Sequence, residues 1–447
     1  MKKSLFAMAA LTAFTGAAQA QSSVTVYGIL DVGYVGSNAR EVGATASGAG
    51  TQGNINKIQK SAIGQSAEQT SRLGFRGTED LGGGASAFFT VEMGLTPQNG
   101  SLSGGTARDA VQQNMNASGT AIDNRQTFVG LKKNGIGQFA IGRQYTPVFV
   151  AGAATDPGAY NNVAGNVIYN SGSVYSADNN ASGTNNNVGF TNRADNAITA
   201  KSDSFGGLSV GGMYAMANQN ATIGSGNNTI SSTGGTTNWN GWGLSADYTW
   251  QKLFVTAAYQ SFKTQYTNVL TSGSTPGVMG FGGPVSGTLA GASGVTIFNP
   301  TNTSDKQTFA GATYDFGILK AYAQWVGRKV NNDITVAASG AGAASFAGEQ
   351  VNRTAQQLGV RSYITPKIEA WGSVGSGKYK GNPVSATVAS GSVNFIGWQL
   401  GSNYYLSKRT NLYAIYGQQQ TSSATPVNTA GSGNSANQYA VGVRHTF

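Results

Sequence analysis

The sequence predicts an all-β fold, a 16-stranded antiparallel transmembrane β-barrel. Three observations carry this prediction. Apolar and polar residues alternate with a period of two, which is typical of a strand with two different faces. The connections between these segments alternate between long and short. No apolar run beyond the first 20 residues reaches the roughly 18 residues that a spanning helix requires.

The first 20 residues have the three-part pattern of a secretory signal peptide. Lys2 and Lys3 precede an apolar run from Leu5 to Gly16, and Ala18-Gln19-Ala20 follows as a cleavage site. The apolar run is too short to span a bilayer. We therefore expect residues 1–20 to be removed and residues 21–447 to form one barrel. The loss of two lysines and no acid lowers the net charge from +10 to +8.

The segment Trp242–Gln251 shows the strand pattern clearly. Aromatic and apolar residues alternate in it with small and polar residues, so that each kind lies on its own face. A soluble β-sandwich would give the same alternation in any single strand, so the number of such segments along the chain is the stronger evidence for a barrel. Sixteen such segments begin near residues 24, 71, 84, 124, 137, 193, 208, 240, 252, 306, 318, 354, 367, 393, 409 and 437.

The connections between these segments indicate a membrane barrel. Short turns lie at 79–83, 133–137, 204–207, 251–252, 315–317, 365–367 and 407–409. Long loops rich in Gly, Asn, Ser and Thr lie at 35–70, 97–123, 146–192, 218–238, 265–305, 331–352, 381–392 and 420–436. Short periplasmic turns and long external loops are typical of an even-stranded outer-membrane barrel. A barrel of 16–18 strands leaves an aqueous lumen, so the architecture already favours a pore.

Several motifs resemble the general porins of Gram-negative bacteria, especially those of β-proteobacteria. The clearest is Ser71-Arg72-Leu73-Gly74-Phe75-Arg76-Gly77-Thr78-Glu79-Asp80-Leu81-Gly82-Gly83-Gly84, which is similar to the second strand and turn of that family. The segments 24–31, 124–131, 142–147 and 441–447 extend the resemblance over the mature chain.

The resemblance implies a homotrimer of 16-stranded barrels in the outer membrane. Each barrel would carry an inward-folded third loop, here residues 146–192, and would contact outer-membrane lipid and lipopolysaccharide. The terminal Phe447 would be the signal that the barrel-assembly machinery recognises.

The same resemblance assigns the pore constriction to basic residues on the wall. It places Arg72 on the second strand, Arg125 on the fourth and Arg193 on the sixth. Parity gives independent support, because Leu73 and Phe75 belong on the outer face, so that Arg72 and Arg76 point inward. Arginine facing lipid at mid-depth costs roughly 2–4 kcal/mol.

In the fourth strand, the period of two places Arg125 on the same face as Thr127 and Val129, and Phe128 on the other face. Each arginine could instead pair with a lumen acid, for which Asp31, Asp123 and Asp195 are the candidates. Arg143 has the parity of Phe139 and Ile141, so we expect it to point outward at a subunit contact.

The third loop is poor in acids, which bears on the selectivity of the pore. Its only acids are Asp156 and Asp178, of which Asp156 is assigned to the constriction. The loop lacks the acidic Pro-Glu-Phe-Gly-Gly stretch of enteric relatives, and Ile29 stands where those relatives often carry a lumen lysine. Inward arginines, an acid-poor loop and a net charge of +8 together favour anions.

Other functions fit the sequence less well. The chain has no Cys and a single His, which excludes thiol chemistry and most His-based metal sites. A hydrolase barrel would need a cluster of Ser or Asp with a histidine. The single histidine, His445, is expected on the outer face of the barrel. The segment 372–378 has P-loop spacing, but Tyr379 replaces the required Ser or Thr.

A secreted adhesin would show a fixed repeat period, which is absent. A substrate-specific porin stays open as an alternative within the pore class. We therefore predict a general diffusion porin that passes small hydrophilic solutes, with no enzyme activity, cofactor, metal or nucleic-acid partner.

Overall fold

The computed structural model describes residues 23–43, 54–98, 123–169, 189–221, 235–266, 269–270, 297–298, 301–338, 341–381, 391–422 and 434–447. The expected signal peptide, residues 1–20, lies outside this set. Over the described residues the chain is almost entirely β-strand, with one helix, α2 (Pro147–Ala154).

Nineteen strands form the sheet within these residues. Their bounds are β1 Ser23–Gly43, β2 Asn54–Gln65, β3 Arg72–Gly82, β4 Ala85–Gly94, β5 Asn124–Lys133, β6 Gly137–Tyr145, β7 Arg193–Ser202, β8 Leu208–Ala221, β9 Gly235–Trp250, β10 Leu253–Tyr266, β11 Val269–Leu270, β12 Ile297–Phe298, β13 Thr301–Asp315, β14 Lys320–Ala338, β15 Ala341–Thr365, β16 Ile368–Gly381, β17 Gly391–Tyr405, β18 Thr410–Thr421 and β19 Asn434–Thr446.

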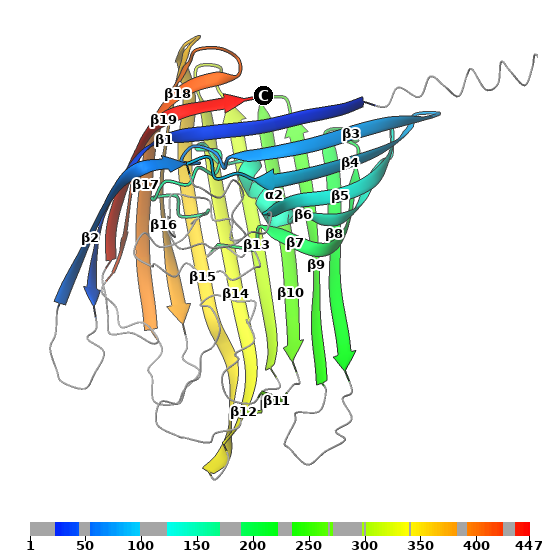
Figure 1. Cartoon of the computed structure of the whole chain (residues 1–447), viewed down its shortest axis with the longest axis vertical. Helices are drawn as coiled ribbons and strands as arrows, with labels where there is room; N and C mark the ends of the chain where they lie inside the picture. The colour runs from blue at the N-terminus through cyan, green and yellow to red at the C-terminus, as the bar shows by residue number, and fades with distance from the viewer. Residues whose placement is uncertain are drawn as a thin grey trace, which may run out of the picture.

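Each barrel strand pairs antiparallel with its neighbours in sequence, and β1 pairs with β19 to close the ring (Figure 1). The strands β2 and β3 are two parts of one barrel strand, since both pair with β1, and β11 and β12 are a two-residue pair. The wall of the described chain therefore has the predicted sixteen strands. Closure pairs the edges of the sixteen-stranded ring, as a lipid environment demands. The β2 part, among the described strands, pairs with β1 alone.

A local interruption separates β2 from β3. Ser66 takes a left-handed backbone conformation, with φ of 59°. The carboxylate of Asp31 accepts hydrogen bonds from the amides of Glu68 and Gln69, at 2.8 and 2.7 Å. These bonds turn residues 66–71 out of the strand, so that they can meet the third loop.

Fifteen of the sixteen predicted strand starts are confirmed to within about five residues, and the short connections occur where they were expected, but the strand predicted to begin near residue 354 begins at Ala341. Two predicted loops are wrong. Residues 35–70 contain the end of β1 and all of β2, and residues 331–352 are largely the hairpin of β14 and β15. The backbone hydrogen bonds between strands continue through these polar segments, because a strand that extends beyond the membrane does not need apolar side chains.

The two faces of the wall differ in the way the alternation predicts. Leu244, Leu358 and Leu400 are about 60% exposed on the outer face. Gln260, Gln307 and Gln399, on the inner face, are fully buried. An apolar exterior and a polar interior are what a barrel in lipid requires.

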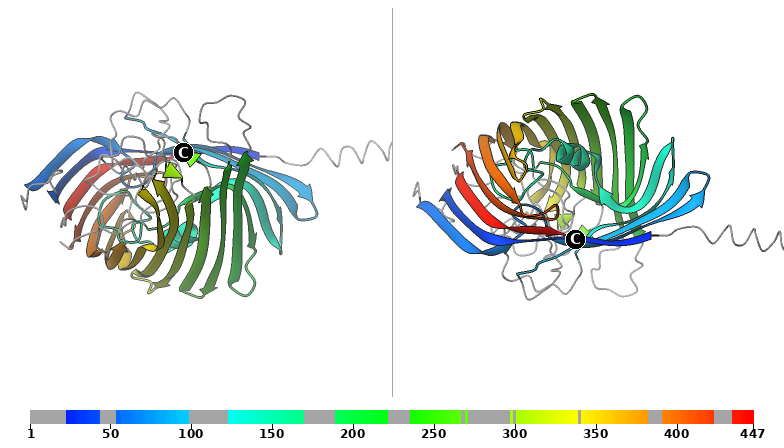
Figure 2. Two further views of the ribbon diagram at one scale, coloured as in Figure 1. Left: turned by 90° about the horizontal axis from the view of Figure 1, so that it is seen from below. Right: turned by 90° about the horizontal axis from the view of Figure 1, so that it is seen from above.

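The polar inner side chains are buried because the third loop lies against them. Figure 2 shows α2 and the coil that follows it inside the ring of strands. The helix begins after Thr146, whose side chain accepts a hydrogen bond from the amide of Phe149, and it has proline at its first position. Among the described residues, no helix is both long enough and apolar enough to cross a membrane.

Candidate functional site: the lumen wall and the third loop

Three arginines from β3, β5 and β7 gather on the inner wall around one carboxylate. The Nε atom of Arg125 donates to Glu92 Oε1 on β4 at 2.8 Å, and Arg72 Nη1 lies 3.8 Å from the same oxygen. The hydroxyl of Tyr145, at the end of β6, accepts from Arg125 Nη2 at 2.8 Å and from Arg193 Nη2 at 3.2 Å. We call these five residues the arginine cluster.

The five residues of the arginine cluster include three guanidinium groups and one carboxylate, so their summed charge is positive; Glu92 contacts Arg72 and Arg125, and Arg193 joins them through Tyr145. Arg125 and Arg193 are 4% and 6% exposed, whereas the side chain of Arg72 is 19% exposed. The guanidinium of Arg193 also lies over the ring of Tyr145, at 4.8 Å from its centroid. Water screens such partly buried charges weakly, so the cluster makes this part of the wall attractive to anions.

The inward direction of Arg125 depends on an irregularity of the strand. Glu92 pairs with Gln126, but Met93 pairs with Asn124, so Arg125 is an extra residue in a β-bulge. Beyond the bulge, Phe128 points inward against Phe88. Val129 is therefore on the outer face, where it is 60% exposed. The prediction that Arg125 points inward is thus met, but the shared parity with Thr127 and Val129 was wrong.

The other residues assigned to the constriction lie in different surroundings. Arg76 faces the lumen in an exposed position, with its guanidinium 5.2 Å from the ring centroid of Tyr27. The Tyr27 hydroxyl donates to Glu92 Oε2 at 3.1 Å, which links Arg76 indirectly to the arginine cluster.

Glu92 pairs with Arg72 and Arg125, whereas two of the three aspartates that the sequence suggested have other partners. Asp31 instead accepts from the Tyr413 hydroxyl at 2.6 Å. Asp195 pairs with Arg143 on the outer face of β6 and β7. The inward parity of Glu92 was visible in the sequence, but its position opposite Arg72 and Arg125 required the strand register.

The third loop begins at the arginine cluster and covers it. The ring of Phe149, in α2, stacks on Tyr145 with centroids 4.2 Å apart. Tyr160 and Tyr169, farther along the loop, stack on each other at 4.4 Å and pack edge-on against Phe149. This aromatic group forms the centre of the largest buried apolar cluster.

A row of wall glutamines fastens the backbone of the third loop to the barrel. Gln357 accepts from the amide of Val167 at 3.2 Å, Gln438 accepts from the amide of Ala164 at 2.7 Å, and Gln324 donates to the carbonyl of Gly152 at 2.8 Å. A glutamine side chain offers a donor and an acceptor without charge, so it can satisfy a backbone that has no strand partner. The glutamines that bond the loop are Gln260, Gln307, Gln324, Gln357, Gln399 and Gln438. We call them the glutamine row.

Glycines beside this row allow the loop to come close. A Cβ on Gly417 would overlap the carbonyl oxygen of Ala164, and one on Gly359 would lie 2.5 Å from Pro157 Cγ. Close approach of another backbone is a recognised use of glycine in strands. The sequence analysis did not identify the glutamine row or the glycines beside it, although glutamine recurs at inward positions of successive strands.

Asp156 lies between the loop and the wall. It is 4% exposed and accepts from Gln357 Nε2 and Asn166 Nδ2, both at 2.9 Å, and from the Tyr160 amide. Burial raises the pKa of Asp156, although these hydrogen bonds and Arg361 oppose the shift. Its carboxylate thus holds the loop rather than facing the opening. Asp178 lies outside the described residues.

A second polar network occupies the wall near β1 and β15–β19. Glu369 accepts from Asn403 and from the Tyr405 hydroxyl, and it lies 3.4 Å from Arg361. Asn411 continues the network to Glu68, at 3.0 Å. The Nε atom of Arg361 also donates to the carbonyl of Pro157 at 2.9 Å, which ties this network to the third loop.

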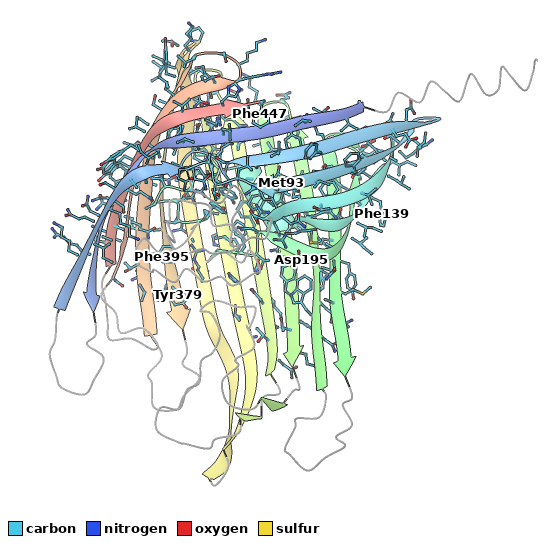
Figure 3. The ribbon with its side chains drawn as sticks, viewed as in Figure 1. Met93, Phe139, Asp195, Tyr379, Phe395 and Phe447 are labelled. Atoms are coloured by element: carbon cyan, nitrogen blue, oxygen red, sulfur yellow. The ribbon has the colours of Figure 1, made fainter. Side chains whose placement is uncertain are left out.

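The last residue completes the closure of the barrel. Phe447 exchanges two backbone hydrogen bonds with Gly28 of β1, at 3.0 and 3.1 Å, and its side chain is 40% exposed (Figure 3). In β16, the segment 372–378 is regular strand, which confirms that its P-loop spacing is coincidental.

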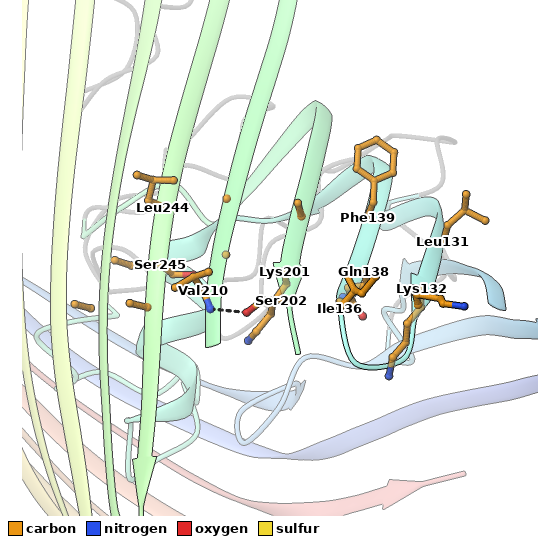
Figure 4. Close-up of a pocket in the computed structure, with 18 of the residues that line it drawn as sticks. Leu131, Lys132, Ile136, Gln138, Phe139, Lys201, Ser202, Val210, Leu244 and Ser245 are labelled. Atoms are coloured by element: carbon orange, nitrogen blue, oxygen red, sulfur yellow. Dashed lines mark hydrogen bonds between the residues drawn. The ribbon is translucent and has the colours of Figure 1, made fainter. Parts of the chain in front are cut away.

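A groove of about 1100 Å³ lies in the outer wall near the short turns (Figure 4). Leu131, Phe139 and Leu244 line it, and each is exposed on the outer face. Its apolar lining separates it from the polar site of the lumen. Within the described residues, no group of three His, Cys, Asp or Glu side chains could hold a metal ion.

Comparison with known proteins gives a consistent result. The family model of the Gram-negative porins matches residues 7–425. An outer membrane porin protein of Bordetella pertussis is 28% identical over the full length of both chains. The outer membrane porin protein 32 of Delftia acidovorans is 45% identical over 104 residues, which are 23% of this chain and 25% of that protein.

Solved structures share the fold. The chain superposes on the anion-selective porin from Comamonas acidovorans with a TM-score of 0.58 and 21% identity, covering 96% of this chain and 100% of that one. The OmpF porin of Salmonella typhi, solved with daunomycin, gives a TM-score of 0.51 at 17% identity, covering 95% and 97%.

Proposed function

Since the chain belongs to the Gram-negative porin family and is an outer-membrane β-barrel pore, we propose that it is a general diffusion channel whose arginine cluster makes it prefer anions. Small hydrophilic solutes would cross passively through the water-filled lumen. No bond is made or broken, and the driving force is the concentration difference of the solute.

The observation that carries this proposal is the excess of guanidinium groups in the arginine cluster. Arg72 and Arg125 both contact Glu92, Arg193 lies beside them on the Tyr145 hydroxyl, and Arg72 is the member most open to the lumen. Rings of charged side chains set the selectivity of pores. Arg76 adds a further exposed positive charge on the same strand. One solved structure with the same fold is named an anion-selective porin, which agrees with the proposed preference for anions.

Measurement in a planar bilayer tests the proposal. Purified protein under a salt gradient should give stepwise conductance and a reversal potential of the sign that means anion preference. The variants Arg72→Gln and Arg125→Gln should bring that potential toward zero while conductance persists. A cation-selective wild type, or unchanged selectivity in both variants, would contradict the assignment.

The oligomer and its partners form a second part of the proposal. We propose a homotrimer in which Arg143 lies at a subunit contact. The Arg143–Asp195 ion pair faces outward, and its guanidinium also donates to the Asn124 carbonyl at 2.7 Å. Charged groups on the outer wall are costly beside lipid, so protein cover is favourable.

The remaining partners are those of an exported membrane barrel. Residues 1–20 would be removed on export, and Phe447, which is held beside β1, would be recognised by the barrel-assembly machinery. Lipid and lipopolysaccharide would contact the outer wall.

A further inference from the structure

Two further arginines face each other on the inner wall, away from the arginine cluster. Arg328 on β14 lies directly opposite Arg353 on β15, and each of them is 2% exposed. Asp305 on β13 accepts two hydrogen bonds from Arg328, from Nε to Oδ1 at 3.1 Å and from Nη2 to Oδ2 at 2.5 Å. Both oxygens of this buried carboxylate are thereby engaged with Arg328.

Arg353 has no comparable acidic partner. Its Nη2 atom donates to the carbonyl of Val167 in the third loop, and its guanidinium carbon lies 5.0 Å from the ring centroid of Phe395 on β17 (Figure 3). Its Nη1 atom is buried without a hydrogen-bond partner, and no ion pair joins Arg353 to a carboxylate within the described part of the chain. Arginine keeps its proton in proteins, and a buried charge without compensation is strongly unfavourable. An anion beside Nη1 would supply the missing compensation.

A glycine of the third loop leaves room beside this nitrogen. A Cβ on Gly189 would lie 3.6 Å from Arg353 Nη1 and 2.3 Å from the carbonyl oxygen of Ile168. The loop backbone can therefore come close to the guanidinium without a side chain that covers it. Ile168 and Phe190, beside this point in the loop, are fully buried and apolar. A phosphate would need a donor for each of several oxygens in these apolar surroundings, so a small monovalent anion fits better.

Arg361, on the same strand, shows that loop attachment alone does not explain the arrangement. It also donates to a carbonyl of the third loop, that of Pro157, but it lies 3.4 Å from the carboxylate of Glu369. Arg353 makes the same kind of bond to Val167 without a carboxylate partner among the described residues. The hydrogen bond to the loop accounts for an arginine at each position, but not for the missing acid at one of them.

We propose that Arg353 binds a small monovalent anion of halide size between β15 and the third loop. The anion accepts a hydrogen bond from Arg353 Nη1 in the space beside Gly189, and Arg328 adds positive charge next to it. By compensating the buried guanidinium, the anion holds residues 167–169 against the wall. The inference goes beyond the proposed function and does not depend on the ion selectivity of the channel.

Anomalous diffraction from crystals of the mature protein grown in bromide locates the anion directly. The wild type should show a bromide peak in contact with Arg353 Nη1. The peak should vanish in Arg353→Gln, which keeps a donor for the Val167 carbonyl but removes the charge. Arg361→Gln is the matched control and should keep the peak. No peak in the wild type, a peak that persists in Arg353→Gln, or equal loss in both variants would overturn the proposal.

Hydrogen exchange in detergent solution tests the same site without a crystal and without a variant. The amides of Ile168 and Tyr169 donate to Asn166 Oδ1 at 2.9 and 2.8 Å, so they report local opening of the loop. When chloride replaces gluconate at equal ionic strength and about ten times its Kd, their exchange should slow roughly tenfold, because the ligand stabilises the closed form alone. The effect should disappear in Arg353→Gln and persist in Arg361→Gln.

Equal exchange of the wild type in the two salts at every chloride concentration would overturn the proposal. Bilayer recordings of the same samples separate this inference from the channel function. A cation-selective wild type that shows the bromide peak would contradict only the proposed preference for anions. An anion-selective wild type without the peak would contradict only the site at Arg353.

Discussion

Arg125 Nε lies 2.8 Å from Glu92 Oε1, and both side chains are 5% exposed. This contact joins β5 to β4 at the point where the β-bulge turns Arg125 inward. The carboxylate lowers the positive charge of the arginine cluster. In the proposed anion-preferring channel, Glu92 is therefore both a structural partner of Arg125 and an acid that weakens the attraction of this wall for anions.

Replacement of Glu92 by Gln should increase anion preference and lower stability together. The cluster then holds three positive charges and no negative one, so the reversal potential under a salt gradient should move further in the anion direction. Loss of one partner of a buried ion pair costs roughly 3–5 kcal/mol, which denaturant unfolding would measure. Asp195→Asn, which removes an acid from the outer face, should leave the reversal potential unchanged. A shift toward cations in Glu92→Gln would exclude this role.

Gly417→Ala should detach part of the third loop from the wall. The added Cβ would overlap the carbonyl of Ala164, whose amide donates to Gln438. Hydrogen exchange at the Ala164 amide should become faster by roughly fivefold, since a typical hydrogen bond contributes about 1 kcal/mol. Gly212→Ala on β8 is the matched control, because its nearest neighbour would be 3.6 Å away. Equal exchange rates in the two variants would mean that the contact does not hold the loop.

Asp156 should make the stability of the docked loop depend on pH. Burial raises its pKa, so the folded protein binds this proton more tightly than the unfolded chain does. The resulting stabilisation is complete below the unfolded pKa of about 3.9 and is lost as the pH rises through the raised folded value.

The slope of unfolding free energy against pH should therefore be flatter in Asp156→Asn than in the wild type over this interval. The slope, rather than the absolute stability, is the measured quantity, because the amide nitrogen of Asn cannot accept from the Tyr160 amide. Identical slopes would show that Asp156 ionises alike in both states.

Arg143→Ala should weaken the proposed trimer. Truncation of one member of a buried interfacial charge pair typically costs roughly 2–5 kcal/mol, and here it would leave Asp195 without its guanidinium partner. Heat dissociation followed by electrophoresis should show monomers at a lower temperature than in wild type. Thr354→Ala, an outward position on β15, serves as control. An unchanged dissociation temperature would place Arg143 outside the contact.

The alternation of apolar and polar residues was sufficient to predict the wall of the barrel. A period of two repeated sixteen times, with alternating long and short connections, determines a closed sheet with an apolar exterior, because lipid tolerates no unpaired edge. The resemblance to porins added the three wall arginines, and the structure brings Arg72, Arg125 and Arg193 together. The loop bounds at 35–70 and 331–352 failed because polar strands outside the membrane give no apolar signal.

Only the tertiary structure decided what each inner side chain touches. Parity cannot reveal the bulge at Arg125, since one extra residue reverses the face of every residue beyond it. It also cannot show that Glu92, rather than Asp31 or Asp195, meets the arginines, nor that Asp156 is enclosed between Gln357 and the loop. These contacts join residues up to about 200 positions apart, so they depend on strand register and on the path of the third loop. The sequence by itself determined that this chain encloses a pore, and the folded wall decided which charges face it.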